Sequence, residues 1–478
     1  MNKVFASFSF PNNLVGVWKA GFTLSKRLFL SFFFILFCLF PLQAQTGNAA
    51  AFAGILNERG HFNPAWVKPA DLYVGIPALS GISAKVDNNF LSWNSAVIRT
   101  GGDSLLLNVP GILDKTRGDY ARVRLEAEVE LLHVGWRKRR NYFQIGLSAY
   151  TGMQLVLSKE SLSFLLQGPG PQTGKRRLDG NRLDFESYAS LYFSYARKLN
   201  RRLRVGGRFK ILQGLWNVHV PDLQLVYDAK PSVDGDSPLL ESVRIQGSAL
   251  TNFPLDNALQ LGDLRFYPFR NLGAALDVGL SYDFKENWNF SAALLNLGFL
   301  VWGDPSAKEF KSDKSYATFL YEGINTEYLN KENGDWAKDL IRSIWDTAGF
   351  ACSDSGAYVR VLPARFNLAL SYTVDERHCF GLLFQAELYN RYFAPELGIS
   401  YTFTPCEHFA LAFSNTFSRG HWLNLGIFAV ARFGPVQLHL GVDRLNAERI
   451  GDMQTAQVNF GLNFIFDRKT KGWNADVW

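Results

Sequence analysis

Charged and apolar side chains alternate along YARVRLEAEVELL, residues 120–132. Successive side chains of a β-strand point to opposite faces, so one face of this segment would be charged and the other apolar. The charged face would hold Arg122, Arg124, Glu126, Glu128 and Glu130, and the apolar face Val123, Leu125, Ala127, Val129 and Leu131. Such a row could form ion pairs that hold strands in register, or it could guide a charged or polar solute.

The segment LRVGGRFKILQG, residues 203–214, repeats this arrangement. Arg204, Arg208 and Lys210 share one face, and the opposite face is mainly apolar. If both segments cross a membrane, an arginine that faces lipid would cost ~2–4 kcal/mol at mid-depth. The charges are therefore expected to face an interior lumen, where an Arg/Glu lattice would narrow the pore or line it for a solute.

Motifs for catalysis or metal binding are absent from the sequence. The seven histidines show neither an HExxH motif nor close ligand spacing, and there is no G-x-S-x-G elbow or phosphate-binding glycine loop. His439 and Asp443 share a face of QLHLGVD and could form half of a hydrolytic site, but any inward face is expected to carry polar residues. The sequence therefore predicts no enzyme, no cofactor and no metal.

The longest apolar run, LFLSFFFILFCLFPLQAQ, follows a basic Lys-Arg pair near the N-terminus. A basic start, a short apolar core and the small residue Ala44 predict a secretory signal peptide at residues 1–44. The alternative is a retained anchor helix, but Pro41 interrupts the run before the ~20 residues that a spanning helix needs. Removal of 1–44 would leave 46 basic and 43 acidic side chains, a balance that does not predict nucleic-acid binding.

The composition favours alternating strands. Hydrophobic residues make up 47% of the chain and aromatic residues 15%, yet mean hydropathy is −0.05, so apolar residues are dispersed along the chain. After signal removal three cysteines remain, Cys352, Cys379 and Cys406, with no CxxC pair. They predict neither a disulfide framework nor a zinc site.

Many segments follow the two-residue rhythm of AQVNFGLNFIF, residues 456–466. Repeated alternating segments of ~10 residues are typical of transmembrane β-barrels. A β-sandwich also alternates, but its strands average ~5–6 residues, and several runs here are longer. The sequence therefore predicts an all-β, transmembrane antiparallel β-barrel of the outer-membrane type.

Short polar turns alternate with longer connections, as expected when one end of a barrel faces the periplasm. Fourteen strands are predicted, with sixteen as the alternative if VPDLQLVYD and VRIQGSAL, within residues 220–271, also cross as a pair. An even number would leave both termini in the periplasm. The predicted strands are 72–84, 121–136, 142–157, 183–197, 203–218, 272–284, 288–301, 361–374, 378–389, 392–403, 408–417, 421–433, 435–444 and 455–467.

Two connections carry helix signals. SKESLSFLLQG offers Ser158 as an N-cap and Gly168 as a stop, and DWAKDLIRSIWDTAGF offers Asp335 and Gly349 in the same roles. These helices are expected to cover loops or the barrel rim, with a lid over the mouth as the alternative.

Four quoted segments together resemble a known family: FNPAWVKPADLYVGIPALSGISAKVDNNF, ASLYFSYARKLNRRLRVGGRFKILQG, NLGAALDVGLSYDFKENWNFSAALLNLGFLVW and RFGPVQLHLGVDRLN. They resemble Bacteroidota outer-membrane barrels of unknown function that are related to the FadL and PorV type of barrel. The resemblance implies an outer-membrane location and an NPA element, at Asn63, Pro64 and Ala65, near the start of the barrel. The signal sequence and the predicted strands give the domain plan: a signal peptide at 1–44, a short periplasmic or plug segment at 45–71, the barrel at 72–467 and a periplasmic tail at 468–478.

The predicted function is a FadL-like passive channel for small or hydrophobic solutes, which aromatic outer-loop segments such as TNFPLDNALQL also favour. The alternative is a structural or type IX secretion-associated barrel of the PorV kind. The predicted partners are outer-membrane lipid, the barrel assembly machinery of a Gram-negative bacterium and other envelope proteins. Fold alone does not choose between the two functions.

Overall fold

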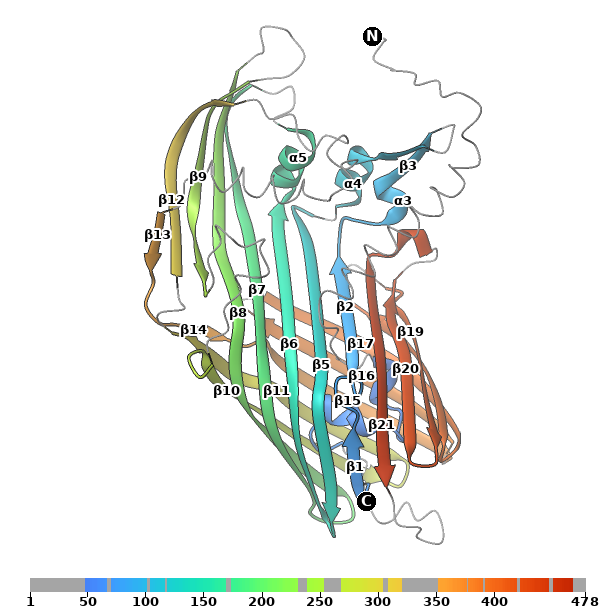
Figure 1. Ribbon diagram of the computed structural model, residues 1–478. Coiled ribbons are helices and arrows are strands. Elements are labelled where there is room, and N and C mark those ends of the chain that lie inside the picture. Colours follow the sequence, from blue (N-terminus) through green and yellow to red (C-terminus); the bar gives the residue numbers. More distant parts are fainter. Residues whose placement is uncertain are drawn as a thin grey trace, which may run out of the picture. The chain divides into compact units, whose positions relative to one another are not determined.

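A closed antiparallel barrel of fourteen strand positions forms most of the computed structural model (Figure 1). The structure describes residues 48–66, 70–100, 104–116, 118–168, 173–230, 239–252, 268–303, 308–319, 351–375, 377–389, 392–418, 422–446 and 450–466. The predicted signal peptide, the tail at 468–478, the helix predicted after Asp335 and most of the TNFPLDNALQL loop lie outside these ranges.

Each barrel strand pairs with its neighbour along the chain, and the last strand returns to the first. The first position is shared by β1 (Leu72–Gly75) and β2 (Ile82–Asn88), which both pair with β5 on one side and β21 on the other. The next strands are β5 (Tyr120–Lys138), β6 (Asn141–Ser158), β7 (Gly174–Lys198), β8 (Leu203–Lys230), β10 (Leu272–Lys285) and β11 (Trp288–Trp302). They are followed by β14 (Tyr358–Val361) with β15 (Ala364–Asp375), β16 (His378–Tyr389), β17 (Tyr392–Cys406), β18 (Phe409–Phe417), β19 (Leu425–Phe433), β20 (Val436–Leu445) and β21 (Thr455–Phe466).

The prediction of fourteen strands is confirmed, and the alternative of sixteen is wrong. Residues Leu203–Gln213 of β8 pair with β10, whereas Val218–Lys230 pair with β9 (Leu239–Thr251). β9 then pairs with β12 (Lys308–Phe319), and β12 with β13 (Ala351–Asp354). The two extra strand-like segments therefore lengthen the sheet beyond the barrel, at the upper left of Figure 1, and add no strand position to its closure.

The outer face of the barrel is apolar and the inner face mainly polar, as the alternation predicts. On β8, Phe209 and Ile211 are about half exposed, whereas Arg208, which precedes Phe209, is buried. On β21, Asn459 and Asn463 are fully buried inside. Because a transmembrane barrel presents an apolar band to hydrocarbon and a polar lumen, this distribution fits a membrane-spanning wall.

The first strand differs from its prediction, which treated 72–84 as continuous. Residues 76–81 leave the ladder between β1 and β2, and Pro77 removes a backbone donor there while Ala78 has a φ of 60°. On β21 only Gly461 and Leu462 stand opposite these six residues. The strand therefore contains a wide bulge in the wall.

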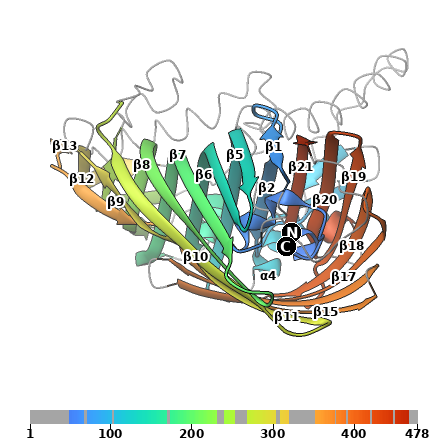
Figure 2. The ribbon, with the colours of Figure 1, turned by 90° about the horizontal axis from the view of Figure 1, so that it is seen from below.

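The residues before the barrel lie inside it, between its walls (Figure 2). This segment contains α2 (Asn48–Ala51) and the 3₁₀ turn η1 (Asn57–His61). Asn48 donates to Thr416 of β18, and Asn63 donates to carbonyls of β10 and β11. We call residues 48–66 the plug, because they contact the wall on opposite sides of the lumen.

Short helices accompany the connections at the end opposite the short turns. They are α3 (Trp93–Ala96), α4 (Val109–Lys115) and α5 (Lys159–Gln167), with a strand pair β3 (Val97–Thr100) and β4 (Ser104–Leu107) and a turn η3 (Ile450–Asp452). The predicted caps of α5 are confirmed, since the Ser158 hydroxyl accepts from the Ser161 backbone and Gly168 ends the helix. Within the described ranges, no helix combines the length and the hydropathy needed to cross a membrane.

Candidate functional site

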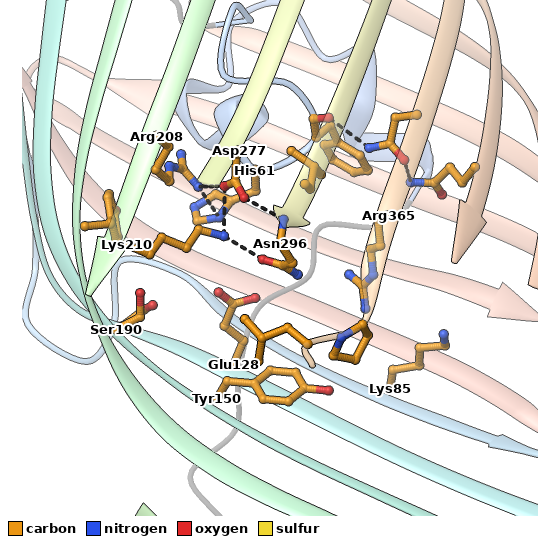
Figure 3. A pocket seen from close by; sticks show the side chains of 18 of the residues that line it. His61, Lys85, Glu128, Tyr150, Ser190, Arg208, Lys210, Asp277, Asn296 and Arg365 are labelled. Atoms are coloured by element: carbon orange, nitrogen blue, oxygen red, sulfur yellow. Dashed lines mark hydrogen bonds and ion pairs between the residues drawn. The ribbon is translucent and has the colours of Figure 1, made fainter. Parts of the chain in front are cut away.

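A cavity lies inside the barrel, between the plug and the walls (Figure 3). The volume that centres of water molecules can reach is about 90 Å³, which is enough for several waters or a small solute. Its lining is mostly polar and charged and draws on the plug and on strands from all around the barrel. It includes His61, Lys85, Glu128, Tyr150, Tyr188, Tyr192, Arg208, Lys210, Asp277, Asn296, Arg365, Gln385, Arg444 and Gln457.

Glu126 is the centre of an ion-pair cluster on one side of this cavity. Its carboxylate lies 2.6 Å from Arg124, 3.4 Å from Lys85 and 3.3 Å from Arg365. Glu387 of β16 contacts both Arg124 and Arg365. The cluster therefore ties β5 to its neighbour β2 and, across the lumen, to β15 and β16.

Arg208 and Lys210 of β8 lie on another part of the wall, where Asp277 of β10 is their common counter-ion. The Lys210 Nζ atom is 2.8 Å from Asp277 and donates to Asn296 at 2.6 Å. The Arg208 guanidinium is 3.9 Å from Asp277 and stacks over the Tyr192 ring, 4.7 Å from its centroid. Figure 3 shows these side chains gathered at the cavity with His61 of the plug.

Two neighbouring carboxylates of β5 have different surroundings. Glu128 lines the cavity, and its carboxylate makes no hydrogen bond or ion pair with any described residue. Glu130 is 1% exposed, and its Oε2 atom accepts from the Tyr192 hydroxyl at 2.8 Å. The two side chains therefore share a strand face, but only Glu130 is hydrogen-bonded to another residue of the wall.

The eight predicted charges do not form one continuous row. Glu128, Arg208 and Lys210 line the main cavity, and Arg124 and Glu126 line a smaller one beside it. Arg204 lies near the short-turn end, where it is 3.4 Å from Asp283. Arg122 and Arg204 line neither cavity.

A bulge in β5 changes the predicted alternation after Glu130. The register shifts between Glu130 and Leu132, so Leu132 is 48% exposed and His133 is 1% exposed. The extra residue is Leu131, and strict alternation therefore fails beyond it. A bulge of one residue reverses the faces of all residues beyond it.

The NPA element attaches the plug to β8 and β10. The Asn63 amide donates to the Leu280 and Ala292 carbonyls at 2.9 and 3.2 Å, and its Oδ1 atom accepts from the Ala65 backbone. Two paired glycines make room for this turn: a Cβ at Gly279 would lie 2.0 Å from Asn63, and one at Gly206 would lie 2.4 Å from Pro64. The glycines are needed here because the plug approaches the wall too closely for a side chain.

Apolar contacts attach the other side of the plug. Phe52, Ile55, Leu56 and Trp66 join a buried cluster with inward-facing residues of β15, β16, β18 and β19. These wall residues are Ala369, Leu383, Ala410, Ala412, Phe428 and Val430. Sequence reasoning missed the apolar patch, although Phe428 and Val430 interrupt an otherwise small or polar inward face of β19.

Several cavity residues were also missed, because they come from distant segments. Lys85, Arg365 and Glu387 complete the cluster around Glu126, and Arg444 pairs with Glu396. Each lies at an inward position of its strand, which is the signal that could have found them. Strand order alone does not show which inward charges meet across a lumen.

His439 and Asp443 face inward, as expected, but the structure does not unite them as a pair. His439 lies 3.7 Å from Glu58 of the plug. Asp443 accepts from the Ala49 backbone and from the Ser414 hydroxyl at 2.8 Å. Both residues therefore contact the plug.

Solved structures with a similar arrangement include two toluene transporters and a FadL homologue. They include TbuX, a toluene transporter of Ralstonia pickettii, with 9% identity, coverage of 89% of this chain and 97% of that chain, and a TM-score of 0.43. TodX, a toluene transporter of Pseudomonas putida, has 11% identity, coverage of 89% and 94%, and a TM-score of 0.41. A FadL homologue of Pseudomonas aeruginosa has 10% identity, coverage of 89% and 99%, and a TM-score of 0.42. Likenesses this distant carry no argument about the solute of this chain.

No curated protein matches the chain by sequence. One family model matches residues 64–443, which include the barrel from its first strand to β20 and the last two residues of the NPA element. The chain belongs to this family, the family of unknown function DUF5723.

Proposed function

We propose that this protein is a passive channel for small solutes in the outer membrane of a Gram-negative bacterium, closed in this structure by its plug. The observation that carries the proposal is the polar cavity between plug and wall. The alternation of apolar outer and polar inner residues supports a membrane location, and the short turns at one end support periplasmic termini.

The lining favours small polar solutes over hydrophobic ones. A hydrophobic solute in the cavity would remove water from charged groups without replacing its hydrogen bonds, and this is costly. Lys210, Glu128 and Arg365 offer both signs of charge, and the tyrosine rings offer flat surfaces for a small solute. A polar solute can therefore replace the water that it displaces.

Passage requires the plug to move. The plug contacts β18 through Asn48, β10 and β11 through Asn63, and β21 through Glu58, which accepts from Asn463. A segment held on opposite walls obstructs the lumen. If the polar side of the plug shifted, the cavity would open toward the end of the barrel that carries the short turns.

Solute uptake by proteoliposomes tests this proposal. Small polar solutes should enter several-fold faster than into protein-free vesicles, and Lys210→Leu should change that rate. Arg177→Leu is the matched control, because Arg177 is exposed and pairs with Asp179 outside the cavity. Folded protein that admits no solute would contradict the channel.

The second candidate is a barrel that binds another envelope protein, as PorV-like members do. The sheet of β8, β9, β12 and β13 favours it, since it extends beyond the barrel and β13 pairs, among described strands, only with β12. An edge strand can accept a further strand from a partner. Photo-crosslinkers at the exposed Pro221 and Asp222 test this candidate in cells; recovery of the barrel alone would count against it.

A further inference from the structure

Three metal-ligating side chains meet where the plug touches β5. His61 comes from the end of η1, and Glu128 and Glu130 are two residues apart on one face of the strand. One ligand atom from each lies within 4.8 Å of the others. The group joins the plug to the wall, and the cavity reaches it at His61 and Glu128.

The atoms that face one another in this group are joined by an ion-pair contact and by no hydrogen bond of good geometry. The Glu130 Oε1 and His61 Nε2 atoms are 3.2 Å apart, yet both are buried without a hydrogen bond to any described residue. Glu128 has no partner among described residues either. One buried and one half-buried carboxylate thus meet an imidazole nitrogen in one region, and a cation that displaces the Nε2 proton would complete the arrangement.

The spacing suits a small divalent ion with nitrogen and oxygen ligands. Zinc bonds of 2.0–2.2 Å in a tetrahedral site place ligand atoms roughly 3.4 Å apart. The His61–Glu130 separation of 3.2 Å already meets that spacing. Glu128 has flexible torsions and no competing contact, so it can close the remaining distance.

The surroundings orient the ligands. The Tyr192 hydroxyl donates to Glu130 Oε2, which leaves Oε1 to face His61, and His133 lies 3.8 Å from the same carboxylate. Arg208 lies 3.4 Å from His61 Nδ1. Metal binding at Nε2 places a proton on Nδ1, so Arg208 must turn toward Asp277, which is 3.9 Å away.

We propose that His61, Glu128 and Glu130 bind a divalent transition-metal ion, with Zn²⁺ as the best match, and that water from the cavity supplies the fourth ligand. A mixed imidazole and carboxylate set with an open position is common for zinc. The ion would bond the plug directly to β5. It would therefore hold the plug in the lumen.

Metal titration of the full-length mature protein, tag-free and stripped with EDTA, tests the site. Calorimetry with Zn²⁺ should give one ion per chain, and Co²⁺ should show a visible absorption band that Zn²⁺ abolishes. His61→Ala and Glu128→Gln should each weaken binding by about tenfold or more. His408→Ala is the matched control, since His408 is exposed in a short turn, and it should leave the affinity unchanged.

If His61→Ala fails to fold, Glu128→Gln still tests the site. This variant is expected to fold, because Glu128 makes no hydrogen bond or ion pair with a described residue. Heat-modifiable migration on gels checks the barrel of every variant. The proposal is overturned if the wild type binds no stoichiometric ion, or if Glu128→Gln binds as tightly as His408→Ala. Binding is measured without transport, so this result does not depend on the proposed channel.

Discussion

The wall around the plug has an apolar side and a polar side. On β15, β16, β18 and β19, inward residues such as Leu383 and Phe428 pack against Phe52 and Trp66 with 5% exposure or less. On β5, β8 and β10, the plug meets Glu130, Arg208 and the backbone of Leu280 through single polar contacts, beside the cavity. One side is close-packed, and the other contains space and charge.

This difference indicates how the lumen can hold a plug and still serve as a passage. Apolar packing needs no oriented partner, and it is lost only when the surfaces separate. Polar contacts can be exchanged for water or for a solute at a small net cost. We therefore expect the apolar side to anchor the plug and the polar side to open.

The largest expected effect is on the polar wall, at Glu126. Glu126→Leu removes the common partner of three cations and leaves their charges buried, so it should destabilise the barrel by about 3–5 kcal/mol. Urea unfolding in lipid vesicles measures this. Glu128→Leu is the matched control on the same face of β5, and equal losses in the two variants would show that the cluster is not structural.

A substitution in the apolar cluster between plug and wall should destabilise the barrel nearly as much. Leu383→Ala should cost about 2–4 kcal/mol, because a fully buried side chain leaves a cavity between β16 and the plug. Outward-facing Leu382→Ala is its control in the same unfolding assay. A Leu383→Ala loss no greater than that of Leu382→Ala would mean that the plug is not packed on this side.

Removal of the NPA amide should loosen the polar side. Asn63→Ala removes two hydrogen bonds to strand carbonyls and should cost about 2 kcal/mol. Protease cleavage within the plug should become faster while heat-modifiable migration is kept. An unchanged cleavage rate would contradict the role of this contact.

The smallest expected effect on stability is at Glu128. In metal-free protein, Glu128→Leu should change the free energy of unfolding by less than ~0.5 kcal/mol, since the carboxylate makes no hydrogen bond or ion pair with a described residue. It should nevertheless shift the preference of the channel toward anionic solutes, measured as the reversal potential in a salt gradient. A large loss of stability with unchanged ion selectivity would show that Glu128 has a structural role and does not act on the solute.

Strand alternation predicted the barrel well, because lipid on one side and a lumen on the other constrain every residue of a strand. It placed Arg208, Lys210 and Glu128 inward from sequence alone. It failed beyond Leu131, where a bulge that no local motif signals shifts the register so that Leu132 faces outward and His133 inward.

The site itself was only partly predictable. Lys85 meets Glu126 from the neighbouring strand β2, Arg365 meets it across the lumen, and Glu387 meets Arg124 there. These segments are far apart in the sequence, and periodicity within one strand contains no information on such contacts. His61 and Glu128 are likewise too distant in sequence for a ligand-spacing motif to connect them. The Asn63 turn was predicted as an element, but its docking against Gly206 and Gly279 depends on the three-dimensional register of β8 and β10.

A disulfide between plug and wall tests the central claim most directly. On the polar side a Cβ at Gly279 would lie 2.9 Å from the Asn63 Cγ atom, so Asn63→Cys with Gly279→Cys places two thiols close enough to form a disulfide. The native cysteines are replaced by alanine, and single-channel conductance is recorded before and after reduction. We predict no openings in the oxidised protein and recovery of openings on reduction; the same conductance in both states would show that solutes pass without movement of the plug.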